Sequence, residues 1–180
     1  RMMDFPFEPI TIDGKTSRQE FVESSFRGDE RYVHLSTHRD VNGFYIHGER
    51  RTHVGIKHFE EYLGRDASGT KKILDGRFLT VSSCGDPRLS FWKDFHTCTN
   101  VSAVVAPMGE VEFDESAMFC TLFYFALLRH PNNSKRQPAS QHIIDFVDTF
   151  QRTKGAYLSL GGCGAYRLCF WWKGEFKEII

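Results

Sequence analysis

A histidine and a cysteine each follow an apolar segment of this sequence. Segment 32–37 reads Tyr-Val-His-Leu-Ser-Thr and is followed by His38, and segment 78–83 reads Phe-Leu-Thr-Val-Ser-Ser and is followed by Cys84. Both segments are typical of buried β-strands. Because the carboxyl ends of parallel strands lie along one edge of a sheet, we expect the two side chains to meet there. An imidazole beside a thiol can remove its proton, so the pair predicts a cysteine hydrolase.

Each member of this pair has an alternative interpretation. His34 lies four residues before His38, so on a strand both side chains would point to the same face. His34 is inside the apolar segment, which is typical of a hydrogen-bonded structural histidine, whereas His38 is at the exit, where a base belongs. Cys84 could be a buried packing residue. Its position before Gly85, at a predicted strand-to-helix turn, favours the nucleophile.

A zinc site is the main rival chemistry. Zinc ligands usually come in compact pairs such as CxxC or HExxH, and neither motif occurs in the sequence. A zinc site would require the fold to bring His34 and His38 together with Cys84 or Cys98, so we predict no metal site. Cys163, which lies among glycines, is a second candidate for an exposed thiol, although a glycine turn is the simpler interpretation.

Composition narrows the class of protein. The chain has 180 residues, 41% of them hydrophobic, and 23 basic residues balance 23 acidic ones. Zero net charge gives no electrostatic argument for binding nucleic acid or an anionic membrane. No apolar run approaches the ~20 residues that span a bilayer. Five cysteines with no CxxC pair do not suggest a disulfide framework, so we expect free thiols and a cytoplasmic location.

The elements that must position these residues alternate between strand and helix patterns. This order predicts one α/β domain over residues 1–180 with a mainly parallel central sheet flanked by helices. The last two strands, joined through glycines, are expected to form an antiparallel edge. The expected helices are 16–26, 53–64, a short one after Pro87, 114–128 and 139–153; the expected strands are 31–37, 44–46, 77–83, 101–106, 157–160 and 166–172, with a turn at 40–43 and a surface loop at 131–140.

In this order the chain resembles the caspase-like cysteine peptidases, and among them the CHAT group related to separase. Three parts carry the resemblance: His34–His38 with its terminal histidine, Val81–Gly85 with its cysteine, and 101–128 with its strand, short acidic loop and Phe/Tyr-rich helix. The resemblance implies a three-layer sandwich and cleavage of peptide bonds through an acyl-thioester, without a metal or organic cofactor. His38 would be the catalytic histidine and Cys84 the nucleophile.

The resemblance also suggests how a substrate would be held. The backbone amides of Arg39 and Cys84 would form the oxyanion site, and Glu110, in the loop after the next strand, would bind the P1 side chain. The family generally has glycine after the histidine, where this chain has Arg39. Metacaspase-like relatives have an acidic residue where this chain has Ser82, so that route to a basic P1 preference is not expected.

We therefore expect a cysteine endopeptidase that acts on protein or peptide substrates, resembling effectors of bacterial defence or signalling systems that a partner protein or domain regulates. The alternative is a catalytically inactive module that binds a protein partner through edge strands or through Trp171 and Trp172. Arg39 and the short N-terminal part before the histidine strand favour this alternative. A third, weaker interpretation is a hydrolase or acyltransferase that uses the same two residues on a small acyl substrate.

Overall fold

The computed structural model describes residues 16–26, 30–46, 52–63, 76–83, 85, 88–130 and 138–180. Cys84 and most of the expected surface loop lie outside these residues. The described part of the chain contains five helices, a five-stranded sheet and a separate three-stranded sheet. The protein is therefore of the mixed α/β class, as expected. Among the described helices, none combines the length and the apolar character that crossing a membrane requires.

The large sheet has the strand order β1-β5-β6-β7-β8. Its strands are β1 (Tyr32–Leu35), β5 (Phe78–Val81), β6 (Ala103–Pro107), β7 (Tyr166–Trp172) and β8 (Glu175–Ile179). The pairs β1/β5 and β5/β6 are parallel, whereas β6/β7 and β7/β8 are antiparallel. The sheet is therefore mixed rather than mainly parallel in its pairing. Every residue of β5 and β6 is buried, as expected for strands covered on both faces.

The antiparallel edge is present but consists of different segments from those expected. Residues 157–160 were predicted to be a strand, and this prediction is wrong because helix α5 (Ala139–Ser159) continues through most of them. Tyr157 is held in the helix by edge-to-face contacts with Phe119 and Tyr166, at ring-centroid distances of 5.5 and 5.7 Å. The second antiparallel strand is β8 instead.

The small sheet consists of β2 (His38–Asp40), β3 (Gly43–Ile46) and β4 (Thr52–Gly55), all antiparallel. The turn between β2 and β3 lies where the sequence predicts it. The expected helix 53–64 is partly wrong: its first residues form β4, and helix α2 (Ile56–Tyr62) follows.

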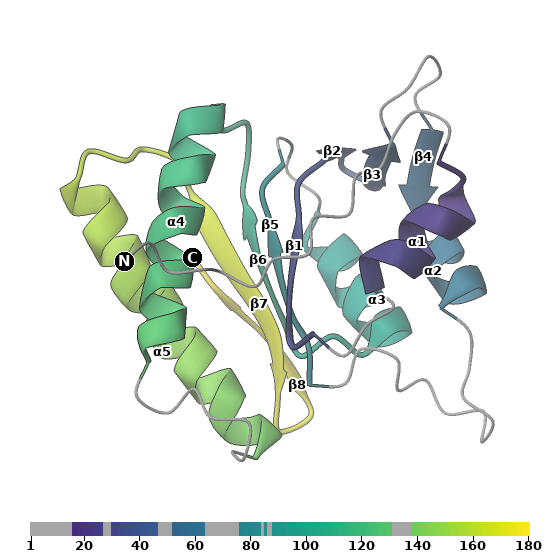
Figure 1. The fold of residues 1–180 in the computed structure, drawn as a ribbon. Helices are drawn as coiled ribbons and strands as arrows, with labels where there is room; N and C mark the ends of the chain where they lie inside the picture. The colour runs from purple at the N-terminus through teal and green to yellow at the C-terminus, as the bar shows by residue number, and fades with distance from the viewer. Residues whose placement is uncertain are drawn as a thin grey trace.

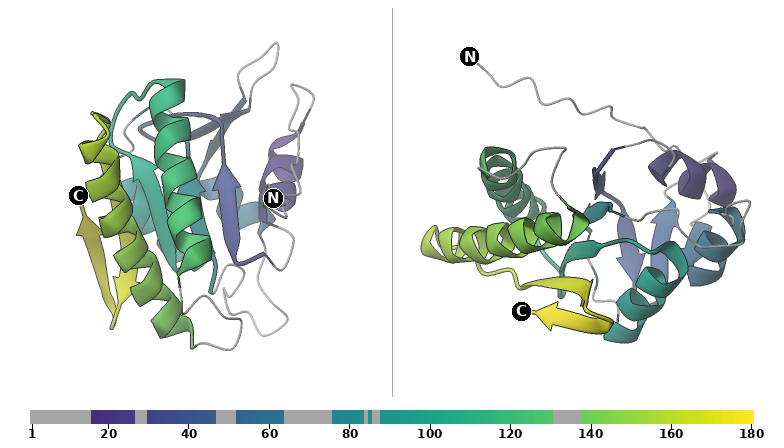
Figure 2. Two further views of the ribbon diagram at one scale, coloured as in Figure 1. Left: turned by 60° about the vertical axis from the view of Figure 1, so that its left-hand side comes forward. Right: turned by 90° about the horizontal axis from the view of Figure 1, so that it is seen from below.

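The helices form a layer on each face of the large sheet (Figures 1 and 2). One layer contains α4 (Phe113–Arg129) and α5, and the other contains α1 (Arg18–Phe26), α2 and α3 (Leu89–Thr99), with the small sheet beside them. Ser17 caps α1, since its hydroxyl accepts a hydrogen bond from the Glu20 amide. Phenylalanine dominates both cores, with Phe44, Phe59 and Phe95 on one side and Phe119, Phe123 and Phe150 on the other.

Candidate active site at the carboxyl edge of the sheet

Three segments that follow the parallel strands β1, β5 and β6 are joined by backbone hydrogen bonds. The Ser82 amide donates to the Leu35 carbonyl over 3.0 Å, which connects the ends of β5 and β1. The Gly85 amide donates to the Gly109 carbonyl over 3.2 Å, which connects the loops after β5 and β6. The carboxyl edge of the parallel strands is therefore one bonded unit, as expected of the edge where ligands bind in such sheets.

His38 does not lie at the exit of β1 as the sequence predicts. Strand β1 ends at Leu35, and His38 is the first residue of β2 in the small sheet. Its side chain is exposed and lies opposite Tyr45 of β3, which in turn lies opposite His53 of β4. Directly opposed residues share a face of a sheet. His38 is thus presented on the exposed face of the small sheet.

Arg39 alternates to the other face of β2 and is buried, with 6% of its surface exposed. Its Nη2 donates a hydrogen bond to the Gly85 carbonyl oxygen over 2.5 Å and another to the carbonyl oxygen of Pro107. The guanidinium also lies 5.5 Å from the ring centroid of Trp92 on α3, within cation–π range. One buried side chain therefore ties the small sheet to the loops after β5 and β6.

The backbone of Arg39 also faces Gly85. A two-residue loop places Asp40 and Gly43 in a hydrogen-bonded pair, so the next pair, Arg39 and Phe44, is a non-hydrogen-bonded one. The amide and carbonyl of Arg39 consequently point away from β3. A Cβ atom at Gly85 would lie 2.7 Å from the Arg39 carbonyl oxygen, so the two backbones are in direct contact.

Gly85 has a conformation that favours glycine. Its φ is +106°, in the region that other residues rarely adopt, and its missing side chain makes room for Arg39. The contact matters for the predicted site because Arg39 and Gly85 immediately follow His38 and Cys84 in the chain. Cys84 itself lies outside the described residues, whereas Ser82, Ser83 and Gly85 on its two sides are described.

His34 anchors the segment before Cys84. Its Nε2 lies 2.7 Å from Ser82 Oγ, and its Nδ1 lies 3.0 Å from the Tyr124 hydroxyl oxygen on α4. Burial lowers the pKa of the His34 imidazole, which favours its neutral form. Both ring nitrogens have hydrogen-bond partners, which agrees with the interpretation of His34 as a structural histidine.

Glu110 is exposed and follows directly after Gly109, the residue that accepts the Gly85 amide. It therefore lies on the loop that is bonded to the Gly85 segment. Phe113, the first residue of α4, has 87% of its surface exposed and lies just beyond this loop. Sequence reasoning missed Phe113, because an aromatic residue at the start of an apolar helix pattern looks like a core residue.

The remaining cysteines fall into two groups. Cys98, Cys120 and Cys169 are buried and contribute to the packing of the core. Cys163 is exposed, and its thiol donates a hydrogen bond to Glu115 Oε1 over 2.6 Å. The Glu115 carboxylate raises the pKa of this thiol through that hydrogen bond and through its charge, so Cys163 is disfavoured as a thiolate.

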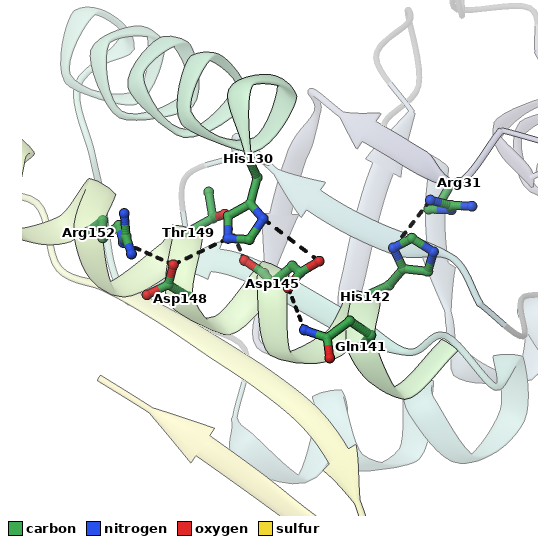
Figure 3. Close-up of polar contacts among 8 residues, drawn as sticks. All are labelled: Arg31, His130, Gln141, His142, Asp145, Asp148, Thr149 and Arg152. Atoms are coloured by element: carbon green, nitrogen blue, oxygen red, sulfur yellow. Dashed lines mark hydrogen bonds and ion pairs between the residues drawn. The ribbon is translucent and has the colours of Figure 1, made fainter. Parts of the chain in front are cut away.

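A second polar cluster joins the C-terminal end of α4 to α5 (Figure 3). His130 lies between two carboxylates, with Nε2 3.3 Å from Asp148 Oδ2 and Nδ1 3.7 Å from Asp145 Oδ2. Gln141 donates to Asp145 and Arg152 pairs with Asp148. Within the described part of the chain, no group of three or more His, Cys, Asp or Glu side chains has a metal-binding arrangement. We interpret this cluster as a structural link between the helices.

The two tryptophans near the C-terminus lie on opposite faces of β7, which is an inner strand and not the edge. Trp171 packs against His96 and Phe176, at centroid distances of 5.7 and 5.9 Å. Trp172 is partly buried beside Ile143 and Val147 of α5. No family model and no curated protein sequence matches the chain.

Proposed function

We propose that the protein is a caspase-like cysteine peptidase in which His38 and Cys84 act together. The observation that supports this proposal best is the contact between Arg39 and Gly85. These residues follow the histidine and the cysteine directly, so their contact brings the two chain segments that carry the proposed pair next to each other. The exposed position of His38 is consistent with a base that must reach a bound substrate.

In the proposed reaction, His38 takes the proton of the Cys84 thiol, and the thiolate attacks the carbonyl carbon of the scissile peptide bond. The tetrahedral oxyanion would be stabilised by backbone amides, for which Arg39 and Cys84 are the candidates. His38 then gives the proton to the leaving amine, and an acyl-thioester remains on Cys84. Attack by water, with His38 again as base, releases the acid and regenerates the thiol.

The orientation of the Arg39 backbone supports its proposed role. Its amide points away from β3 and toward the side of the strand where Gly85 lies. Backbone amides that point to such an edge are the kind of donor that stabilises an oxyanion. Where the family has glycine, this chain has Arg39, whose buried side chain donates to the Gly85 carbonyl oxygen.

Glu110 is the proposed P1-binding residue. It is exposed on the loop whose Gly109 carbonyl accepts the Gly85 amide, so it is tied to the proposed nucleophile segment. A carboxylate in this position would favour a substrate with Arg or Lys at P1.

The test is cleavage of a fluorogenic peptide library that varies P1. We expect turnover by the wild-type protein, and a loss of at least about 100-fold in Cys84→Ala and in His38→Ala, since general bases contribute roughly 10²–10⁴-fold. His53→Ala and Cys163→Ala are matched controls, because they remove a half-buried histidine from the same small sheet and an exposed thiol. Equal losses in the controls would contradict the assignment of the pair.

The competing proposal is an inactive module that binds a protein partner. It predicts that Cys84 has the reactivity of an ordinary thiol and that His38→Ala does not change it. Peptide turnover that depends on both residues would exclude this alternative. A Cys84 that is reactive toward acyl donors but cleaves no peptide would favour the hydrolase or acyltransferase with a small substrate.

A further inference from the structure

We propose that Arg39 is a positioning residue that couples the proposed nucleophile segment to the proposed specificity loop, an inference that rests on the proposed function. The Arg39 guanidinium is the only donor described that bonds to both segments: it donates to Gly85 after β5 and to Pro107 at the end of β6. Cys84 precedes Gly85, and Glu110 follows Pro107 by three residues. A single buried side chain thus bonds to the residue after Cys84 and to the strand end three residues before Glu110.

The chemistry of the side chain suits this task. Both hydrogen bonds come from Nη2, whose two N–H groups lie in the plane of an always charged guanidinium and so can hold two carbonyl oxygens in a fixed relation. Hydrogen bonds from a charged donor are stronger than those between neutral groups. Trp92 of α3 lies beside the guanidinium at 5.5 Å and limits its movement. The burial of Arg39 also shields these bonds from competing water.

Backbone hydrogen bonds near the Arg39 guanidinium also connect the loops after β5 and β6. Gly85 donates to Gly109, and Met108, next to Pro107, donates to the carbonyl of Ala165. Loss of the guanidinium would leave the carbonyls of Gly85 and Pro107 without this donor, and the loops could then separate. The expected consequence is a change in the relative position of nucleophile and P1 site, which is different from a uniform loss of stability.

Two substitutions separate these possibilities. Arg39→Lys keeps the charge and a donor nitrogen but loses the planar guanidinium, and Arg39→Met keeps much of the apolar stem and loses both the charge and the donor. Arg167→Met is the matched control, because Arg167 is equally buried at 6% exposure but lies in β7 of the large sheet, where it pairs with Glu178 at 3.1 Å.

The first readout is independent of activity. Hydrogen exchange at the Gly85 amide, followed by NMR, should be at least about tenfold faster in Arg39→Met than in wild type, with Arg39→Lys between them and Arg167→Met unchanged, since a lost tenfold protection corresponds to about 1.4 kcal/mol. If the Gly85 amide exchanges at the wild-type rate in both Arg39 variants, the proposal that Arg39 positions the Gly85 segment is wrong.

The second readout is the ratio of kcat/KM for a peptide with Arg at P1 to that for a peptide with Leu at P1. We expect this ratio to fall at least about fivefold in Arg39→Met and less in Arg39→Lys, whereas a purely structural role would lower both values equally. An unchanged ratio would overturn the coupling. If the wild-type protein cleaves no peptide, both the proposed function and the coupling to P1 preference are wrong. Exchange at the Gly85 amide still tests separately whether Arg39 positions the Gly85 segment.

Discussion

Arg39 donates a 2.5 Å hydrogen bond from its guanidinium to the carbonyl oxygen of Gly85. The backbone carbonyl oxygen of Arg39 also lies against Gly85, on the side where a Cβ atom would be. Strand β2 is therefore fastened to the loop after β5 by both side chain and backbone. This contact joins two sheets that share no strand pairing. It also gives the residue after His38 a buried structural role that glycine could not fill.

The Arg39 carbonyl oxygen lies too close to Gly85 for a side chain to fit there. Gly85→Ala places a Cβ 2.7 Å from the Arg39 carbonyl oxygen at a φ of +106°, so we expect destabilisation of about 1–3 kcal/mol and a loss of peptidase activity of at least about tenfold. Gly109→Ala is the control, because its Cβ would meet no atom within 4 Å. Urea unfolding and kcat/KM measure the two effects, and equal behaviour of the two variants would contradict the steric argument.

Glu110 is predicted to determine a preference for a cationic P1 side chain. Glu110→Gln should lower kcat/KM for Arg at P1 by about 10- to 100-fold and leave Leu at P1 nearly unchanged, since hydrogen bonds to charged groups are worth about 1.5–3 kcal/mol. Glu112→Gln removes an exposed carboxylate two residues away and should have little effect. A similar loss in Glu112→Gln would indicate a general effect of negative charge at this edge instead of a specific contact.

Cys163 is predicted to be a slow thiol because of Glu115. The carboxylate accepts the thiol hydrogen bond and raises the pKa of Cys163, so removing its charge should increase the thiolate fraction at neutral pH. Glu115→Gln should therefore accelerate alkylation of Cys163 by iodoacetamide at pH 7.5 several-fold, as followed by mass spectrometry of the labelled peptide. Asp114→Asn is the control for charge on the same helix turn, and no acceleration specific to Glu115→Gln would refute the assignment.

His96 is predicted to make the fold sensitive to acid. Burial lowers its pKa to about 4, whereas the unfolded chain titrates near 6.5, so the unfolded state binds more protons between these values. The contribution is complete above pH 6.5 and is lost as pH falls toward 4, by at most about 3 kcal/mol. His96→Gln should show a smaller difference in unfolding free energy between pH 7 and pH 4.5 than wild type. An equal difference would place the acid sensitivity elsewhere.

Much of the fold follows from local patterns. The fully buried strands around Thr80 and Val105 and the long helix that begins near Asp114 are apolar runs with clear ends, and the structure has them within a few residues. Two errors came from segments whose state depends on tertiary contacts. Tyr157 remains helical because Phe119 and Tyr166 pack on it. Both residues lie outside the local segment, so the pattern of residues 157–160 could not indicate these contacts.

The sequence analysis missed strand β8 because its segment contains three charged residues and forms a strand only by pairing with β7. Lys173 and Gly174 both have positive φ, at 52° and 81°, which is the turn that joins such strands tightly. Gly174, two residues after Trp172, was a signal in the sequence that could have predicted this turn. For the site, sequence identified the candidate residues, but it could not show that Arg39 is buried against Gly85, because that contact depends on how two sheets pack.

The proposed action of His38 on Cys84 is tested most directly by labelling with an acyloxymethyl-ketone peptide that carries Arg at P1, with the modified residue located by mass spectrometry. Wild type, Cys84→Ala, His38→Ala and the control His53→Ala would be compared at equal concentration and with folding verified. We expect labelling at Cys84 in wild type and His53→Ala, and none in Cys84→Ala or His38→Ala. Labelling of Cys84 that is unchanged in His38→Ala would contradict the assignment of His38 as the base.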